Sequence, residues 1–140
     1  MQVTHPPSRQ QIIALLNARG VLPTRQRVDI AHMFLSRSQH LSAEQVLHQV
    51  NEKEDRISKA TVYNTLGLLA RKGLIRELTV DPERIVYDSN PSPHHHLYNI
   101  DSGELLDIPS ESIDLSELPE LPSGTTLVGV DVIVRIRSQG

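Results

Sequence analysis

The sequence predicts an α+β protein in which short helices and a two-stranded hairpin are followed by a smaller, strand-rich domain. Apolar residues repeat at helical spacing up to residue 73 and alternate after it, as in strands. Up to Tyr87 the chain has 12 Lys and Arg against 8 Asp and Glu, whereas from Asp88 onward it has 2 against 9. Because these charges suit different partners, we expect two domains, residues 1–87 and 88–140.

Four short helices are expected before residue 74. The first covers residues 10–16 and is stopped by Gly20, and the second follows the capping residue Thr24. Ser42 and Gln45 have the spacing of a capping box, which starts the third helix. Ser58 caps the fourth, which ends at residue 73. Each of these helices is expected to bury one apolar face.

A hairpin is expected to follow the helices, with strands at residues 74–80 and 85–88 joined by a turn at Asp81 and Pro82. Helices closed by a hairpin form the winged-helix arrangement, in which one helix enters the major groove of DNA. The polar face of the fourth helix carries residue types that meet phosphates, Lys59 and Arg71, and residue types that meet base edges, Tyr63 and Asn64. The alternative is a solvated helix face without a ligand.

The second half is interrupted by prolines and contains expected strands at residues 95–100, 104–108 and 126–137, with room for a short helix around 113–118. In the last strand five apolar residues share one face: Val128, Val130, Val132, Val134 and Ile136. Fewer than about 55 residues with few aromatic side chains give a thin core. We therefore expect a homodimer that covers this apolar face.

A run of three histidines is the strongest chemical signal. In a strand His94 and His96 point to one side and His95 to the other, so that two imidazoles face one ion. Asp88 and Asp107, which end expected strands, add oxygen ligands. The chain has no cysteine, so the site suits Fe(II) or Mn(II), with Zn(II) possible in vitro. The alternative is an exposed polar run that binds metals adventitiously.

The composition excludes several classes of protein. Without cysteine there is no disulfide scaffold, thiolate catalysis, iron–sulfur cluster or structural zinc held by four cysteines. The N-terminus has no apolar signal segment and no stretch is long enough to span a bilayer, so we expect a cytoplasmic protein with no membrane partner. A small His and Asp metalloenzyme is the alternative of another class. It is disfavoured because the chain has no HExxH motif and no nucleophile constellation, so we expect no enzyme.

Six strings resemble the ferric uptake regulator (Fur) superfamily, in its order and at its spacings. They are PTRQR at 23–27, HLSAEQV at 40–46, SKATVYNTL at 58–66, GLI at 73–75, VYD at 86–88 and HHH at 94–96. The resemblance implies a metal-responsive transcription regulator, and control of iron homeostasis is the leading hypothesis. It also implies a homodimer on double-stranded operator DNA, with a winged helix, an α/β dimerisation domain and a regulatory metal at the hinge.

The resemblance places the hinge site on five residues, which match the ligand set of the peroxide-sensing branch: His40, Asp88, His94, His96 and Asp107. His40 comes from the resemblance alone. The implied DNA-binding residues are Arg25, Lys59, Thr61, Tyr63 and Asn64. Among them Tyr63 is the expected base contact, and Asn64 stands where a basic residue is common.

The chain departs from most of the family because the first CxxC pair falls on Asn99 and Ser102. This departure and the DVIVRIR ending look most like the iron response regulator (Irr) branch, which responds to haem. A haem here would need His94, His95 or His96 as its ligand, since no cysteine is present. Three hypotheses stay open: an iron- or haem-responsive regulator, a repressor that senses peroxide through oxidation of an Fe(II)-bound histidine, and the metalloenzyme.

Overall fold

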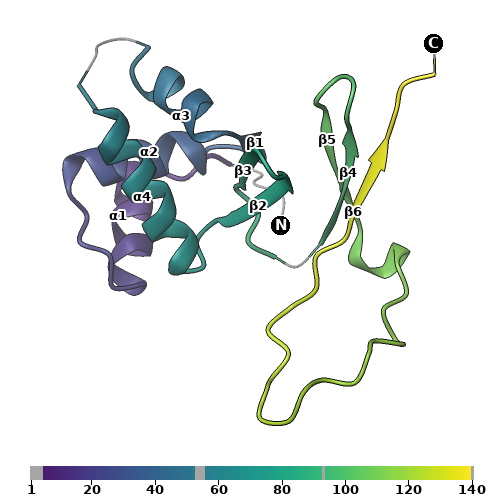
Figure 1. Cartoon of the computed structure of the whole chain (residues 1–140). Coiled ribbons are helices and arrows are strands. Elements are labelled where there is room, and N and C mark those ends of the chain that lie inside the picture. The colour runs from purple at the N-terminus through teal and green to yellow at the C-terminus, as the bar shows by residue number, and fades with distance from the viewer. Residues whose placement is uncertain (1–4, 53–55, 93, 140) are drawn as a thin grey trace. The chain divides into compact units, whose positions relative to one another are not determined.

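The computed structural model describes residues 5–52, 56–92 and 94–139. The chain forms two compact units, Met1–Pro91 and Ser92–Gly140, and each has its own sheet (Figure 1). The division follows Pro91, so that Asp88 belongs to the first unit. Among the described residues, no helix combines the length and the apolar character that crossing a bilayer requires.

Four helices in the first unit confirm the helical prediction: α1 (Arg9–Ala18), α2 (Arg25–Phe34), α3 (Ala43–Val50) and α4 (Lys59–Arg71). The expected caps Thr24, Ser42 and Ser58 each accept a hydrogen bond from a backbone N–H in the first turn. Ser42 also forms the predicted capping box with Gln45. After α4 the chain turns at Gly73, whose φ of 74° is costly for residues with a side chain.

The four helices share one hydrophobic core, to which each contributes its apolar stripe. Phe34, Val46 and Leu66 are fully buried there, as are Ile12 and Leu16 of α1. The fourth helix turns Val62, Leu66 and Leu69 inward, as its sequence pattern predicts. This packing fixes α3 against α4 and leaves the polar face of α4 exposed.

The sheet of the first unit has three antiparallel strands in the order β1-β3-β2, formed by β1 (His40–Leu41), β2 (Arg76–Asp81) and β3 (Arg84–Asp88). The hairpin of β2 and β3 confirms the expected wing, and its turn is closed by a hydrogen bond from the Glu83 N–H to the Asp81 carboxylate. The two-residue strand β1 was not predicted. Two residues show no periodicity, and only their pairing with β3 defines them.

The second unit has a sheet in the order β5-β4-β6, formed by β4 (His95–Asn99), β5 (Leu105–Ile108) and β6 (Ile133–Ile136). Strand β4 pairs antiparallel with β5 and parallel with β6. The turn between β4 and β5 is held by the Asn99 side chain, which accepts hydrogen bonds from the backbone N–H groups of Asp101 and Ser102. Strands β4 and β5 confirm the strands expected at residues 95–100 and 104–108, each to within one residue.

The second unit differs from the sequence pattern in two places. No helix forms around residues 113–118; a short 3-10 turn, η1 (Ser110–Ser112), precedes them. There the Asp114 carboxylate accepts a hydrogen bond from the Ser116 N–H, a local contact that competes with a helix, and Pro119 follows. The strand expected at 126–137 is limited to Ile133–Ile136, because a strand needs a neighbour and the pairing of β4 with β6 starts at Ile133.

The fold predicts that side chains of the helical core contribute far more to the stability of the first unit than exposed side chains do. Phe34→Ala should lower the free energy of unfolding by about 3–5 kcal/mol, because it removes a fully buried aromatic ring and leaves a cavity. Leu22→Ala, at a side chain that is 69% exposed, is the matched control and should change it by less than about 0.5 kcal/mol. Urea unfolding followed by circular dichroism measures both, and an equal loss in the two variants would contradict this core.

Candidate functional site

In the first unit, antiparallel pairing of β1 with β3 brings His40 opposite Asp88. The His40 Nε2 atom lies 3.0 Å from Asp88 Oδ2, and the Asp88 side chain is fully buried. The other carboxylate oxygen of Asp88 accepts a hydrogen bond from the Asn90 N–H. The ladder continues where the Ser89 N–H donates to the Gln39 carbonyl, so the backbone holds both side chains in place.

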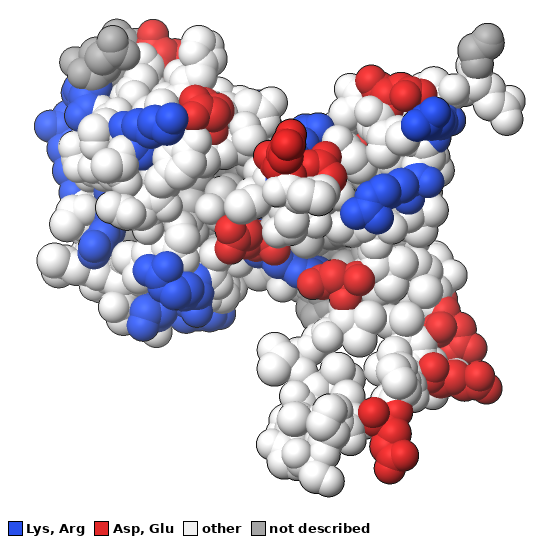
Figure 2. Space-filling view, viewed as in Figure 1, with Lys and Arg blue, Asp and Glu red and all other residues white. Residues whose placement is uncertain are grey.

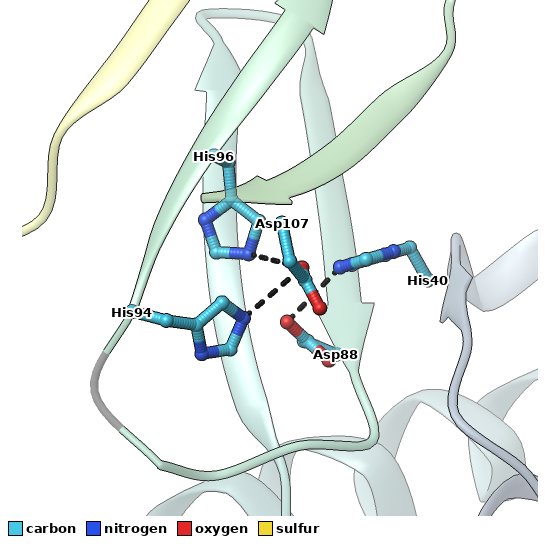
Figure 3. A group of neighbouring side chains, drawn as sticks. All are labelled: His40, Asp88, His94, His96 and Asp107. Atoms are coloured by element: carbon cyan, nitrogen blue, oxygen red, sulfur yellow. Dashed lines mark hydrogen bonds and ion pairs between the residues drawn. The ribbon is translucent and has the colours of Figure 1, made fainter. Parts of the chain in front are cut away.

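In the second unit, antiparallel pairing of β4 with β5 brings His96 opposite Asp107. His94 lies two residues earlier and points the same way, since side chains alternate along extended chain. Asp107 Oδ1 lies 3.1 Å from His94 Nε2 and 3.4 Å from His96 Nε2, and the two imidazole rings are 4.5 Å apart (Figure 3). Three potential ligands therefore converge within this unit.

The tautomer of His94 indicates what this cluster can hold. Its Nδ1 lies 2.6 Å from the Ser92 carbonyl oxygen, which only accepts, so Nδ1 carries the proton. In the neutral ring Nε2 then offers a lone pair toward the Asp107 carboxylate. Two acceptors facing each other need a cation or a proton between them, and a backbone carbonyl behind the ring is the usual partner of a metal-bound histidine.

His95 lies on the opposite face of β4. Its Nδ1 accepts a hydrogen bond from the Val132 N–H over 3.2 Å, and its side chain is buried. Its Nε2 has no hydrogen-bond partner in the described part of the chain. This orientation agrees with the predicted alternation and separates His95 from the face that carries His94 and His96.

The candidate ligands are nitrogen and oxygen donors of the kind that divalent transition metals bind. Imidazole and carboxylate occur among them in each unit, and sulfur does not. Such nitrogen and oxygen ligands suit Mn(II), Fe(II) or Zn(II), whereas Cu(I) prefers thiolate and thioether. Figure 3 shows that one imidazole–carboxylate pair comes from the first unit, while two imidazoles and one carboxylate come from the second.

The exposed face of α4 carries the predicted DNA-binding residues. Lys59, Tyr63 and Asn64 are exposed, and the Thr61 hydroxyl accepts a hydrogen bond from the Ser58 hydroxyl. Arg25, the first residue of α2, is exposed as well. Figure 2 shows several Lys and Arg side chains on the face of the first unit in view.

A shallow groove of about 260 Å³ lies between the start of α2 and α4. It is lined by Thr24, Gln26, Arg27, Thr61, Asn64, Thr65 and Leu68. Thr61 and Asn64 belong to the predicted set, whereas Arg27 was not singled out. The Arg27 guanidinium donates a hydrogen bond to the Leu22 carbonyl over 3.2 Å, which holds this side chain next to the segment that precedes α2.

Sequence reasoning missed Glu44, which contacts two of the predicted residues. The Tyr63 hydroxyl donates to Glu44 Oε1 over 2.7 Å, and Lys59 Nζ lies 3.2 Å from the same oxygen. The hydrogen bond from Tyr63, and then the Lys59 ammonium, lower the pKa of Glu44, which keeps it ionised. From the sequence Glu44 is only an acidic residue in the first turn of α3, which is common for helix-dipole reasons alone.

Comparisons with known sequences agree with the resemblance. The family model described as the ferric uptake regulator family matches residues 17–133. A ferric uptake regulation protein of Synechococcus elongatus is 36% identical over 104 residues, which cover 71% of this chain and 71% of that protein. A peroxide-responsive repressor, PerR, of Staphylococcus epidermidis is 30% identical over 105 residues, which cover 75% of this chain and 70% of that protein.

A solved structure agrees with the fold. The ferric uptake regulator from Pseudomonas aeruginosa with manganese matches with a TM-score of 0.71 and 26% identity, over 91% of this chain and 97% of that one. These findings do not test the assignment to the Irr branch, which stays a prediction. The helices, the wing, the second sheet and the matched residues lead to one conclusion: the chain belongs to the ferric uptake regulator family.

Proposed function

We propose that this protein is a metal-dependent transcription regulator that binds operator DNA as a homodimer and controls iron homeostasis. The observation that carries the proposal is the pairing of an imidazole with a carboxylate on adjacent strands in each unit, His40 with Asp88 and His96 with Asp107. The names of two relatives, a ferric uptake regulation protein and a peroxide-responsive repressor, support a role in transcription regulation linked to iron.

One ion shared by the ligands of both units is the arrangement we propose for the metal. His40 and Asp88 alone make an incomplete ligand set, and so do His94, His96 and Asp107. The five residues that the family resemblance assigns to the hinge would together supply three nitrogen and two oxygen ligands. Mn(II) or Fe(II) suits this set, and the Pseudomonas aeruginosa relative was solved with manganese. A shared ion favours the arrangement of the units that it binds best, and so alters DNA affinity without touching the DNA.

Operator DNA is the proposed partner of the first unit, with α4 as the reading helix. Tyr63 and Asn64 are exposed one after the other on that helix and reach base edges, while Lys59 and Arg25 neutralise phosphates. Thr61, whose hydroxyl lines the groove beside α2, contributes a contact to the DNA backbone.

A homodimer is the proposed state, and the second unit is its interface. Among the described residues of that unit, the buried ones are Tyr98 and three histidines. Large apolar side chains remain exposed in the single chain, including Val128, Val134 and Ile136. A unit that buries so little of its own apolar surface is stabilised when a second copy covers that surface.

Peroxide sensing is the second candidate function, favoured by the likeness to the Staphylococcus epidermidis repressor and by the sulfur-free ligands. Haem binding has no comparable support among the described residues and stays a prediction. The metalloenzyme hypothesis is disfavoured, since the matched relatives named above are regulators.

The shared-ion proposal predicts that His40→Ala and His96→Ala both abolish tight Mn(II) binding although they lie in different units. Each should cost more than the roughly 10- to 100-fold that an outer-shell partner contributes, because each removes a ligand. Isothermal titration calorimetry should find one Mn(II) per chain in the unaltered protein. Two independent ions per chain, or unaltered affinity in His40→Ala, would contradict a shared ion.

His95→Asn is the matched control for those variants. The asparagine carbonyl can accept the Val132 N–H in place of Nδ1, so the sheet is preserved while an imidazole is lost. Mn(II) affinity should remain that of the unaltered protein. If His95→Asn lost as much affinity as His96→Ala, the assignment of ligands to one face of β4 would be wrong.

DNA reading by α4 predicts different effects at two neighbouring positions. Tyr63→Ala should weaken operator binding by about 1–3 kcal/mol and leave random-sequence binding almost unchanged, because a base contact is lost. Lys59→Ala should weaken both alike and reduce the salt slope by about one, because a phosphate contact is lost. Fluorescence anisotropy over a range of salt concentrations measures both, and equal losses on both duplexes for Tyr63→Ala would refute the reading role.

Peroxide sensing predicts that hydrogen peroxide oxidises His94 or His96 in the Fe(II)-loaded protein and releases it from DNA. The Mn(II)-loaded protein is the control and should stay bound and unmodified. Peptide mass spectrometry locates the added oxygen, and electrophoretic mobility shift follows the DNA. Release without histidine oxidation, or the same oxidation with Mn(II), would argue against this second candidate.

A further inference from the structure

A carboxylate from α3 lies beside the exposed face of α4, although a surface that binds DNA phosphates is usually positive. Glu44 reaches this face from α3, and its side chain is 61% exposed. Phosphates repel an exposed carboxylate, so Glu44 lowers the affinity of this face for any nucleic acid. The function proposed above gives no role to this charge.

Glu44 connects the two residues that we assign to DNA reading. One carboxylate oxygen, Oε1, accepts the Tyr63 hydroxyl over 2.7 Å and lies 3.2 Å from Lys59 Nζ. Lys59 Nζ also lies 5.5 Å from the centre of the Tyr63 ring, within reach of a cation–π contact. The three side chains form a closed triangle in which each contacts the other two.

The helices that carry these three side chains are fixed by a capping box and by core packing. Glu44 lies in the first turn of α3, where the Ser42 hydroxyl accepts the Gln45 N–H and the Gln45 side chain accepts the Ser42 N–H. Val46 of α3 and Val62 of α4 are fully buried in the common core. The backbone positions of Glu44 and Tyr63 are therefore set by packing, and the hydrogen bond selects one orientation of the phenol.

We propose that Glu44 is a positioning residue that increases sequence specificity by holding Tyr63 and Lys59 in their reading conformation while it lowers nonspecific affinity. The inference rests on the proposed reading role of α4. An exposed Tyr and Lys otherwise sample several rotamers, and ordering them on DNA costs free energy. The carboxylate orders them beforehand and also offsets the charge of Lys59, so phosphates alone attract this face less strongly.

The test uses the full-length protein loaded with Mn(II) and two labelled duplexes. One is the duplex that the unaltered protein enriches from a random pool, and the other is a random-sequence duplex of equal length. Glu44→Ala should bind the random duplex more tightly, with a salt slope steeper by about one. The ratio of enriched-duplex to random-duplex affinity should fall about three- to tenfold, the cost of ordering one or two side chains.

Further variants separate the positioning of Tyr63 from the negative charge of Glu44. Glu44→Gln retains an oxygen that accepts the Tyr63 hydroxyl, so the affinity ratio should stay within about twofold of the unaltered protein although random-duplex affinity rises. Glu52→Ala removes an exposed acid just beyond the other end of α3 and should leave the ratio unchanged. In a Tyr63→Phe background, Glu44→Ala should lower the ratio no further, because the hydroxyl is already absent.

Several results would overturn the inference. They are an unchanged or increased ratio in Glu44→Ala, the same fall in Glu52→Ala, or additive losses in the double variant. If thermal unfolding shows that Glu44→Ala is destabilised, Tyr63→Phe decides, because it removes the same hydrogen bond and retains Glu44. The ratio should then fall in Tyr63→Phe, and an unchanged ratio would overturn the inference. An unaltered protein that prefers no duplex would refute the proposed DNA-reading function and this inference with it, whereas a normal preference with an unchanged ratio would refute this inference alone.

Discussion

Antiparallel strand register is the constraint on which the chemistry of this protein rests. Side chains directly opposite each other on paired strands lie close enough for an imidazole to meet a carboxylate. The register of β1 with β3 places His40 opposite Asp88, and that of β4 with β5 places His96 opposite Asp107. If either register shifted by one residue, one strand would turn its side chain to the opposite face of the sheet. The imidazole and the carboxylate of that sheet would then no longer meet.

The second unit combines this chemistry with a small core. Its buried residues within the described part of the chain are mostly imidazoles, which are polar and need partners. His94 satisfies one nitrogen through the Ser92 carbonyl, and His95 through the Val132 N–H. The candidate ligands His94 and His96 are therefore also among the few buried side chains of this unit, and they offer nitrogen donors in a chain without cysteine.

The DNA-reading surface that we propose on the first unit balances affinity against specificity. Phosphates attract any positive face, whatever the base sequence. Glu44 offsets part of that attraction and contacts Tyr63, the residue most suited to a base edge. The hydrophobic core under α3 and α4 makes this possible, because it holds two helices from separate parts of the sequence at a fixed distance.

The amino-acid sequence predicts the four helices, the caps of three of them, the wing and the alternation of His94, His95 and His96, because these features depend on local spacing. It could not determine β1, the limits of β6, or the contact of Glu44 with Tyr63. His40 entered through family resemblance alone, since a histidine before a helix cap carries no signal of its own. These features follow from packing between distant parts of the chain, because a strand or a contact between distant residues forms only where a partner is present.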